Sequence, residues 1–296
     1  MDNNQIFKKT RIAPTPSGFL HLGNVLSFVI TAGLAKKTGA KIFLRIDDAD
    51  RERTNKLYVQ DIFDTLDFLG IPWHEGPRNL HEYEHEYSQV HRIGLYKQVL
   101  QQLRDDGALF ACRCTRTQVV VQRDSSVYPG TCRNLNIPLD AESVSWRLRT
   151  KKDQVLEVKT WPGTVVEATL PPTMSEFIVR KKDGFPAYQL TSVVDDMYFG
   201  VDLIVRGSDL WNSTLAQLYL ASLIKGQSFS GTTFYHHPLL NGTDGNKLSK
   251  SAGDTSVHYL RKEGKQPGDV YTSIAGMLNI AEPVETWEQL FALMVL

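Results

Sequence analysis

The chain has 296 residues, 33 basic and 33 acidic side chains, and 42% hydrophobic residues. This composition supports a folded core, and zero net charge argues against a protein that holds nucleic acid through a global positive field. No apolar run approaches the roughly 20 residues of a membrane helix, and the first residues lack the apolar stretch of a signal peptide. We therefore expect a cytoplasmic protein with no membrane partner.

Apolar spacing over the first hundred residues alternates between helical runs and short strands. The predicted elements are a helix over 22–37 that stops at Gly39, a strand over 41–46, a helix capped by Thr54 that ends at Gly70, and a helix over about 87–104. Alternation of this length is typical of a parallel α/β sheet.

The pattern changes after Gly107, where short strand candidates over 144–150 and 155–161 are separated by Pro and Gly. Beyond this stretch the predicted elements are a strand over 176–181, a helix over 188–197, a strand over 202–207, a helix over 213–225 and tail helices over 269–278 and 286–295. The sequence thus predicts an α/β domain whose halves, 1–107 and 176–240, are split by an inserted strand-rich domain over 108–175. A loop and a short helical tail would fill 241–296.

The first motif runs from Gly18 to Gly23. Its glycine spacing matches the start of a P-loop, but Asn24 and Val25 stand where a P-loop needs Lys and Ser or Thr. Two prolines before it form a stiff turn that leads into a helix start, where free N–H groups attract a phosphate. His21 would donate a hydrogen bond there, and Gly23 would let a flat base approach. A proline-rich loop with a capping histidine is the alternative.

The second motif is Asn246-Lys-Leu-Ser-Lys-Ser251, which follows the flexible stretch Asn241-Gly-Thr-Asp-Gly. Two lysines on a mobile loop can close on a triphosphate and neutralise charge as pyrophosphate leaves. Taken alone, the run is more typical of a solvated basic loop.

Together the two motifs resemble the signatures of the class I aminoacyl-tRNA synthetases. His21-Leu-Gly-Asn24 is similar to their HIGH sequence, and Lys247–Ser251 is similar to KMSKS. Longer strings resemble the glutamyl and glutaminyl group, and they lie at 11–23, 44–50, 185–188 and 205–209. The resemblance covers nearly the whole chain and implies a Rossmann-like parallel sheet with an inserted, zinc-binding, acceptor-stem-type domain.

The resemblance also implies roles for single residues. Residues implied to bind L-glutamate are Arg11, Ala13, Thr15, Asp47, Tyr188 and Arg206. Among these, Asp47 would meet the α-ammonium group and Arg206 the side-chain carboxylate. Residues implied to bind ATP, which enters with Mg²⁺, are His21, Gly23, Asn24 and Lys250, and those implied in catalysis are His21, Lys247 and Lys250.

Two departures from the family pattern bear on specificity and catalysis. Asn24 replaces the second histidine of HIGH, which changes one donor to the adenylate. Glutamyl enzymes usually have RIED where this chain has Arg45-Ile-Asp47-Asp48, and glutaminyl enzymes resemble RFDD more closely. Arg206 nevertheless favours glutamate, since a guanidinium fork matches a carboxylate with two charge-assisted bonds that a neutral amide cannot offer.

Three cysteines, Cys112, Cys114 and Cys132, fall within 21 residues. A reducing cytosol disfavours a disulfide, and three thiolates suit a tetrahedral Zn²⁺ whose fourth ligand the spacing does not reveal. The segment resembles the glutamyl-Q tRNA(Asp) synthetases, which carry C-x-C followed by Y-x-x-x-C. That resemblance implies Tyr128 as the fourth ligand and one structural zinc per chain. Three thiols without metal are the alternative.

His81-Glu-Tyr-Glu-His85 satisfies the zinc-protease pattern H-E-x-x-H. The stretch has almost no aliphatic residues for a helix with an apolar back face. We therefore expect a polar connection or an exposed helix start here.

The chain ends 45 residues after Ser251, so we expect no anticodon-binding domain, as in the glutamyl-Q enzymes. The resemblance then implies a monomeric enzyme that activates glutamate with ATP and transfers it to queuosine in the anticodon of tRNA(Asp). Three alternatives stay open: a fragment of a glutamyl-tRNA synthetase that charges tRNA(Glu), a non-catalytic tRNA-binding paralogue, and a small-metabolite nucleotidylyltransferase.

Overall fold

The structure is a computed structural model that describes residues 5–121, 127–226, 229–240 and 256–294. The chain forms two compact units. Unit 1 comprises residues 1–89, 201–209 and 233–296, and unit 2 comprises residues 90–200 and 210–232. Unit 1 is therefore assembled from segments that are far apart in the sequence, whereas the two segments of unit 2 are separated only by residues 201–209.

Unit 1 contains four parallel strands in the order β2 (Lys41–Leu44), β1 (Lys9–Ile12), β8 (Leu203–Gly207) and β9 (Thr233–His237). The parallel α/β sheet predicted from the sequence is confirmed, although β1 and β9 were not recognised as strands. The chain runs from β1 outward to β2, whereas β8 and β9 lie on the other side of β1. The strand order therefore reverses between β1 and β8, the position where ligands bind at the carboxyl ends of open α/β sheets.

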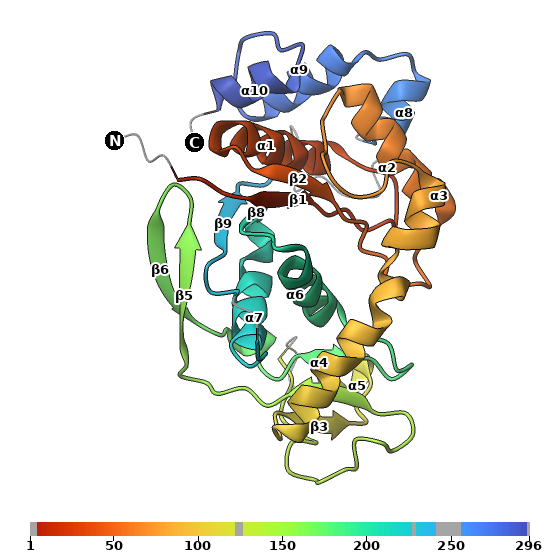
Figure 1. Cartoon of the computed structure of the whole chain (residues 1–296), viewed down its shortest axis with the longest axis vertical. Helices are drawn as coiled ribbons and strands as arrows, with labels where there is room; N and C mark the ends of the chain where they lie inside the picture. The colour runs from red at the N-terminus through yellow and green to blue at the C-terminus, as the bar shows by residue number, and fades with distance from the viewer. Residues whose placement is uncertain (1–4, 122–126, 227–228, 241–255, 295–296) are drawn as a thin grey trace. The chain divides into compact units, whose positions relative to one another are not determined.

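The helices of unit 1 are α1 (Leu22–Thr38), α2 (Lys56–Leu69), α3 (Leu80–Glu82), the π-helical turn η1 (Tyr83–Tyr87), α8 (Val257–Lys262), α9 (Pro267–Met277) and α10 (Trp287–Leu293). Helix α1 contacts both tail helices, which lie alongside it in Figure 1. Gly33 permits this approach, because a Cβ there would lie 2.1 Å from the Phe291 ring. Asn55 caps α2 through a 2.9 Å bond from the Leu57 amide, so Thr54 was the wrong cap.

Unit 2 combines an antiparallel sheet, a hairpin and helices. The sheet has the order β3 (Leu109–Cys112), β4 (Ser145–Leu148), β7 (Ile178–Arg180), and the hairpin joins β5 (Val155–Thr160) to β6 (Thr164–Thr169). The helices are α4 (Ile93–Asp105), α5 (Arg116–Val121), α6 (Tyr188–Phe199) and α7 (Trp211–Ala221), with a 3-10 turn at Pro172–Met174.

Helix α4 begins six residues later than the sequence predicts, because a 3-10 turn at Gln89–Arg92 precedes it. Arg92 at this entry pairs with Asp195 of α6, whose carboxylate accepts bonds from Nε at 2.7 Å and Nη2 at 2.9 Å. The same carboxylate accepts a 2.7 Å bond from the Tyr96 hydroxyl. Asp195 is fully buried, so this network fixes α4 against α6.

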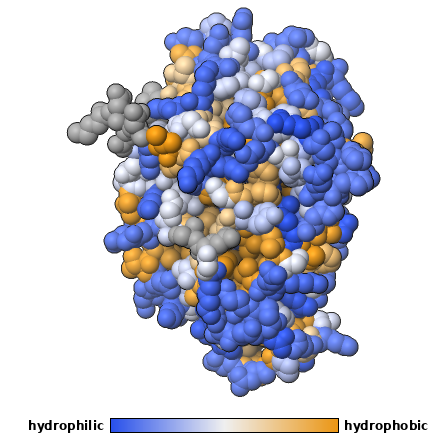
Figure 2. Space-filling model, in the orientation of Figure 1, coloured by the Kyte–Doolittle hydropathy of each residue, from blue (hydrophilic) through white to orange (hydrophobic). Residues whose placement is uncertain are grey.

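Within the described residues, no helix combines the length and apolar character needed to cross a bilayer. Hydrophilic side chains cover much of the face seen in Figure 2.

Candidate active site

The start of α1 is shaped by His21 and Asn24. Nδ1 of His21 accepts a 3.1 Å bond from the Gly23 amide, and the His21 amide donates to Oδ1 of Asn24 at 3.1 Å. The two residues thus cap the helix reciprocally. Because Nδ1 accepts, the neutral imidazole carries its proton on Nε2, where it can donate. Asn24, which replaces the second histidine of the HIGH signature, therefore has a role in fixing the helix start.

The loop before α1 is held by charged groups of α2 and α8. Asp61 of α2 is 2% exposed and lies 3.2 Å from Nδ1 of His258, and it also pairs with Arg261. Phe19 stacks on the His258 ring with centroids 3.9 Å apart. No sequence pattern indicates this network, because Asp61 lies about 200 residues from His258 and Arg261.

Ser256, the first described residue after the KLSKS motif, forms an antiparallel bridge with His21. The bridge is reinforced by a 2.9 Å bond from the Val257 amide to the Leu20 carbonyl. Lys247 and Lys250 themselves lie outside the described residues.

Arg11 and Arg206 occupy the two central strands, β1 and β8, at the point of strand reversal. Both are buried, with 6% and 3% exposure. Nη1 of Arg11 donates a 3.1 Å bond to the Val205 carbonyl. Strand register pairs Thr10 with Leu203, which puts Arg11 and Arg206 on the same face of the sheet. Two cationic side chains are thus brought together in a buried region.

Strand β9 adds two residues to this face that the sequence analysis missed, Phe234 and His236. Arg206 is directly opposite His236 in the parallel register, and its Cζ lies 5.6 Å from the centre of the Phe234 ring. The Phe234 and His236 rings stack at 6.1 Å. Two aromatic side chains separated by one residue in the strand Thr233–His237 were the available signal.

Burial is the main cause that lowers the pKa of His236 to about 4, and the charges of Arg206 and, more weakly, of His237 and Arg11 contribute to this shift. The imidazole is therefore neutral at pH 7. Burial also lowers the pKa of His237, whose Nε2 lies 2.6 Å from the Ser27 hydroxyl of α1. The two histidines of β9 thus add no positive charge at pH 7 to that of the two guanidinium groups.

Asp47 follows β2 and is 7% exposed. Its two carboxylate oxygens accept bonds from Nε and Nη2 of Arg45 at 2.6 and 3.2 Å, and its amide donates to the Pro14 carbonyl at 2.9 Å. A carboxylate has lone pairs for further donors, so Arg45 orients Asp47 without saturating it. Ala13 is half-buried and Thr15 is exposed.

Tyr188 belongs to unit 2, where it is the first residue of α6 and is 41% exposed. The remaining predicted glutamate ligands belong to unit 1.

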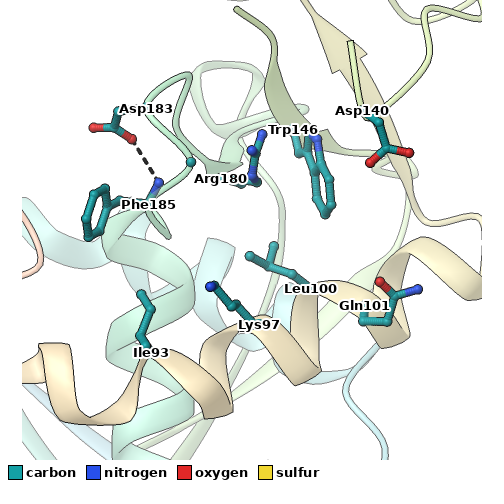
Figure 3. A pocket seen from close by; sticks show the side chains of 10 residues that line it. Ile93, Lys97, Leu100, Gln101, Asp140, Trp146, Arg180, Asp183 and Phe185 are labelled. Carbon is teal, nitrogen blue, oxygen red and sulfur yellow. Dashed lines mark hydrogen bonds between the residues drawn. The ribbon is translucent and has the colours of Figure 1, made fainter. Parts of the chain in front are cut away.

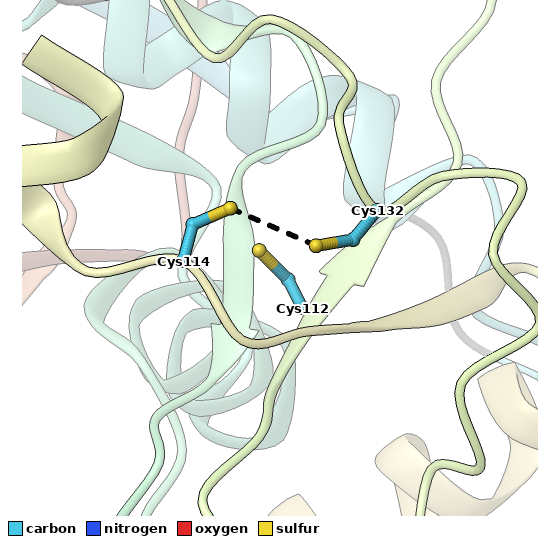
Figure 4. Close-up of side chains that lie close together, drawn as sticks. All are labelled: Cys112, Cys114 and Cys132. Carbon is cyan, nitrogen blue, oxygen red and sulfur yellow. Dashed lines mark hydrogen bonds between the residues drawn. The ribbon is translucent and has the colours of Figure 1, made fainter. Parts of the chain in front are cut away.

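The three cysteines converge in unit 2, and Figure 4 shows their thiols directed toward one another. Their sulfur atoms all lie within 4.8 Å of one another, and those of Cys114 and Cys132 are 3.6 Å apart. The Tyr128 hydroxyl lies 3.5 Å from Sγ of Cys112 and accepts a 2.8 Å bond from the Cys132 amide. Four soft or phenolic donors in this arrangement suit one tetrahedral Zn²⁺.

The protonation of these groups depends on their neighbours. Burial and the other two thiols raise the pKa of Cys114 to about 12. Burial also acts to raise the pKa of Cys112, but the Tyr128 hydroxyl and the Arg147 guanidinium outweigh it and bring this pKa below its ordinary value. The Arg147 guanidinium lies 3.7 Å from the centre of the Tyr128 ring. Without a cation the Cys114 thiol therefore keeps its proton at pH 7, and a divalent cation that binds to the cluster would have to displace it.

His81 and His85 do not gather with a third ligand among the described residues. Their rings stack at 4.1 Å on the short α3 and η1 turns, and both are exposed. The expected exposed polar connection is confirmed.

Comparison with solved structures defines the class of fold. The structure matches a glutamate-tRNA synthetase from Elizabethkingia anophelis with a TM-score of 0.75 and 20% identity, over 96% of this chain and 65% of that one. The fold is that of a class I synthetase catalytic region, with an α/β parallel sheet.

Sequence comparison then gives the family. The family described as "tRNA synthetases class I (E and Q), catalytic domain" matches residues 8–277, and the chain belongs to it. A glutamyl-Q tRNA(Asp) synthetase from Symbiobacterium thermophilum is 32% identical over 94% of this chain and 90% of its own length. A glutamate–tRNA ligase 2 from Syntrophus aciditrophicus is also 32% identical, over 89% of this chain. The chain spans only 56% of that ligase.

Proposed function

We propose that this protein activates L-glutamate with ATP–Mg²⁺ to glutamyl-adenylate and transfers the glutamyl group to queuosine in the anticodon of tRNA(Asp). The observation that carries the first half is the pair of buried arginines, Arg11 and Arg206, on adjacent central strands beside the neutral His236. A guanidinium can offer a carboxylate two parallel charge-assisted bonds, and the side-chain carboxylate of glutamate can accept them.

In this proposal Arg206 binds the glutamate side chain, and Asp47 accepts from the α-ammonium group. Arg45 orients the Asp47 carboxylate through its 2.6 Å bond. Arg11, Ala13 and Thr15 complete the glutamate contacts of unit 1, and the family resemblance implies Tyr188 as a further glutamate ligand.

ATP is proposed to bind at the start of α1. The helix N-terminus and the Nε2–H of His21 would stabilise the phosphates, and Gly23 and Asn24 would shape the approach of the nucleotide. Lys247 and Lys250 would neutralise the charge that develops as pyrophosphate leaves. The bridge between Ser256 and His21 supports this, since it anchors the chain just beyond the KLSKS motif at the helix start.

Activation would proceed by attack of the glutamate α-carboxylate on the α-phosphorus of ATP, which breaks the α–β phosphoanhydride bond and releases pyrophosphate. A queuosine ring hydroxyl would then attack the acyl carbon and release AMP. Catalysis would come from positioning and charge stabilisation, without a covalent enzyme intermediate.

Support for queuosine as acceptor comes from the relatives. The match extends over 90% of the Symbiobacterium glutamyl-Q tRNA(Asp) synthetase. The equal identity to the Syntrophus glutamate–tRNA ligase favours the second candidate, glutamylation of tRNA(Glu) at its 3′ end.

We also propose that Cys112, Cys114, Tyr128 and Cys132 hold one structural Zn²⁺. The convergence of the three sulfur atoms and the position of the Tyr128 hydroxyl support this ligand set. When bound, the zinc would cross-link β3 to the segment around Cys132.

Glutamate-dependent ATP–pyrophosphate exchange without tRNA tests activation, and glutamate transfer to tRNA(Asp) with and without queuosine tests the acceptor. We expect exchange without tRNA and transfer only to the modified tRNA. No exchange without tRNA, or charging of tRNA(Glu) at its 3′ end, would refute the queuosine proposal. Exchange that prefers glutamine would refute the role of Arg206, and undiminished exchange by His21→Ala would refute the ATP site.

A further inference from the structure

Unit 2 contains a cavity of about 530 Å³ that none of the predicted site residues lines. Ile93, Lys97 and Leu100 form one wall on a single face of α4, and Trp146, Arg180 and Phe185 come from the sheet and the turn that follows β7. In Figure 3, Lys97 and Leu100 project from the helix toward Trp146 and Arg180. The volume lies within the range of about 300–1,000 Å³ that is typical of small-ligand clefts.

Arg180 is held in place by its neighbours. Trp146 of β4 pairs with Arg180 of β7 in the antiparallel register, and the guanidinium carbon lies 4.7 Å from the centre of the indole ring. Nη1 donates a 3.4 Å bond to the Val144 carbonyl. A Cβ on Gly184 would lie 3.5 Å from Nη2, so the turn runs close to the guanidinium. A fixed, planar cation of this kind suits phosphate recognition.

The charges of the cavity favour an anion. Two carboxylates line the cavity, but each pairs with a basic side chain from outside the lining. Asp140 pairs with Arg104 at 2.8 Å, and Asp183 pairs with Lys181 at 3.1 Å. Among the described residues, no carboxylate lies within ion-pair distance of Lys97 or Arg180. The lining thus contains two cations that form no ion pair among the described residues, while its two carboxylates are paired elsewhere, although the Arg180 charge lowers the pKa of Asp140.

The rest of the lining favours a ligand that is also flat and partly apolar. Phe185 offers an aromatic ring, and Ile93 and Leu100 offer aliphatic contact. An unstacked nucleotide combines one phosphate with one base, and proteins bind such nucleotides through aromatic rings, aliphatic side chains and Arg or Lys. Lys97 and Gln101 are exposed, so the cavity opens to solvent along α4 and leaves a path for the adjoining nucleotides of a polymer.

We propose that this cavity binds one unpaired nucleotide of the tRNA substrate, with its phosphate against Lys97 and Arg180 and its base against Phe185. The proposal rests on the proposed function in that the RNA is the tRNA acceptor of that reaction. It adds a tRNA-binding position that is separate from the chemistry of activation.

The test uses the full chain and measures its affinity for tRNA(Asp) bearing queuosine, and for tRNA(Glu), at several salt concentrations. Lys97→Gln and Arg180→Gln remove one charge each, Arg180→Lys keeps the charge without the planar fork, and Lys152→Gln is the control, an exposed lysine of unit 2 outside the cavity. Melting temperatures check folding. Exchange of pyrophosphate into ATP without tRNA is measured on every variant.

We expect Lys97→Gln and Arg180→Gln to weaken tRNA binding about 5- to 10-fold and to reduce the slope of log affinity against log salt by about 0.7–1. Arg180→Lys should recover the salt slope but only part of the affinity, and Lys152→Gln should match the wild type. The rate of ATP–pyrophosphate exchange without tRNA should be the same in all variants as in the wild type.

Unchanged tRNA affinity in both charge-removal variants would overturn the proposal, as would an equal loss with Lys152→Gln. AMP serves as the probe for a free nucleotide. If AMP binding depends on Lys97 while tRNA affinity does not, the cavity takes a small nucleotide and the tRNA proposal fails. Absence of exchange in the wild type would instead refute the proposed function, so the two failures are distinguishable.

Discussion

Replacing Arg206 by glutamine tests the electrostatic basis of amino-acid selection. Arg206 is 3% exposed and faces the Phe234 ring and the neutral His236, so water competes weakly for its guanidinium. Hydrogen bonds to charged groups contribute about 1.5–3 kcal/mol each. A glutamine at this position lacks the charge and can donate only one of the two hydrogen bonds to the glutamate side chain. The loss in the free energy of glutamate binding amounts to roughly 3 kcal/mol, or about 10²-fold in the binding constant.

The assay is ATP–pyrophosphate exchange with glutamate or glutamine as the amino acid, in Arg206→Gln, Arg206→Lys and the wild type. We expect KM for glutamate to rise about 10²-fold in Arg206→Gln and the ratio of glutamate to glutamine use to fall by a similar factor. The KM of Arg206→Lys for glutamate should lie between those of the wild type and Arg206→Gln, because an ammonium keeps the charge but lacks the planar fork.

A second measurement separates this role from a merely structural one. Arg206 is the strongest of the charges that lower the pKa of His236, after burial itself. The pKa of His236, followed by NMR, should therefore rise in Arg206→Gln if the two side chains face each other as described. A KM for glutamate within about 3-fold of the wild type, with unchanged discrimination against glutamine, would refute the reasoning.

Three further predictions concern stability and metal content. His236 has a folded-state pKa of about 4 and an unfolded value near 6.5, so the unfolded chain binds the extra proton between these values. Its contribution to the free energy of unfolding is complete above about pH 6.5 and is lost as the pH falls toward 4, by up to roughly 3 kcal/mol. In urea unfolding at pH 7 and 5, the free energy of unfolding should therefore decline less in His236→Gln than in the wild type. Cys132→Ser should lose the stoichiometric zinc that metal analysis of the wild type is expected to find, and a wild type without zinc would contradict the ligand set. Gly33→Ala should lower the free energy of unfolding by about 1–3 kcal/mol, because its Cβ would overlap the Phe291 ring. Gly94→Ala is the control, since a Cβ there meets no atom within 4 Å, and it should not lower stability. Equal melting temperatures for the two variants would contradict this packing.

Features set by nearby residues could be predicted from the sequence. Helix α1 begins at Leu22 and stops before Gly39, whose φ of 80° explains the glycine, as the apolar spacing and the stop signals indicated. The strand β8 and the helices α6 and α9 also begin within a few residues of the predicted positions. The start of α4 was wrong, since apolar spacing does not distinguish a π-helical or 3-10 turn from an α-helix.

Features set by strand register could not be predicted in this way. Strands β1 and β9 are short and lie beside prolines or histidines, which hid their pattern. Phe234 and His236 join Arg206 only because β9 pairs with β8 in one register, and no local signal defines that register. The resemblance to synthetases identified Arg11 and Arg206, but it did not reveal the imidazole opposite them.

The register itself has an identifiable cause, which lies in Asp202 just before β8. Its carboxylate accepts bonds from the Lys8 and Lys9 amides at 2.9 Å, its own amide donates to the Lys9 carbonyl at 3.0 Å, and its carbonyl accepts from the Thr233 amide at 2.9 Å. One residue thus aligns the starts of β1, β8 and β9. Because successive side chains of a strand point to opposite faces, a slip of one residue in β8 would turn Arg206 away from Arg11. The common face of Arg11 and Arg206 therefore depends on an aspartate at the amino-terminal ends of these strands.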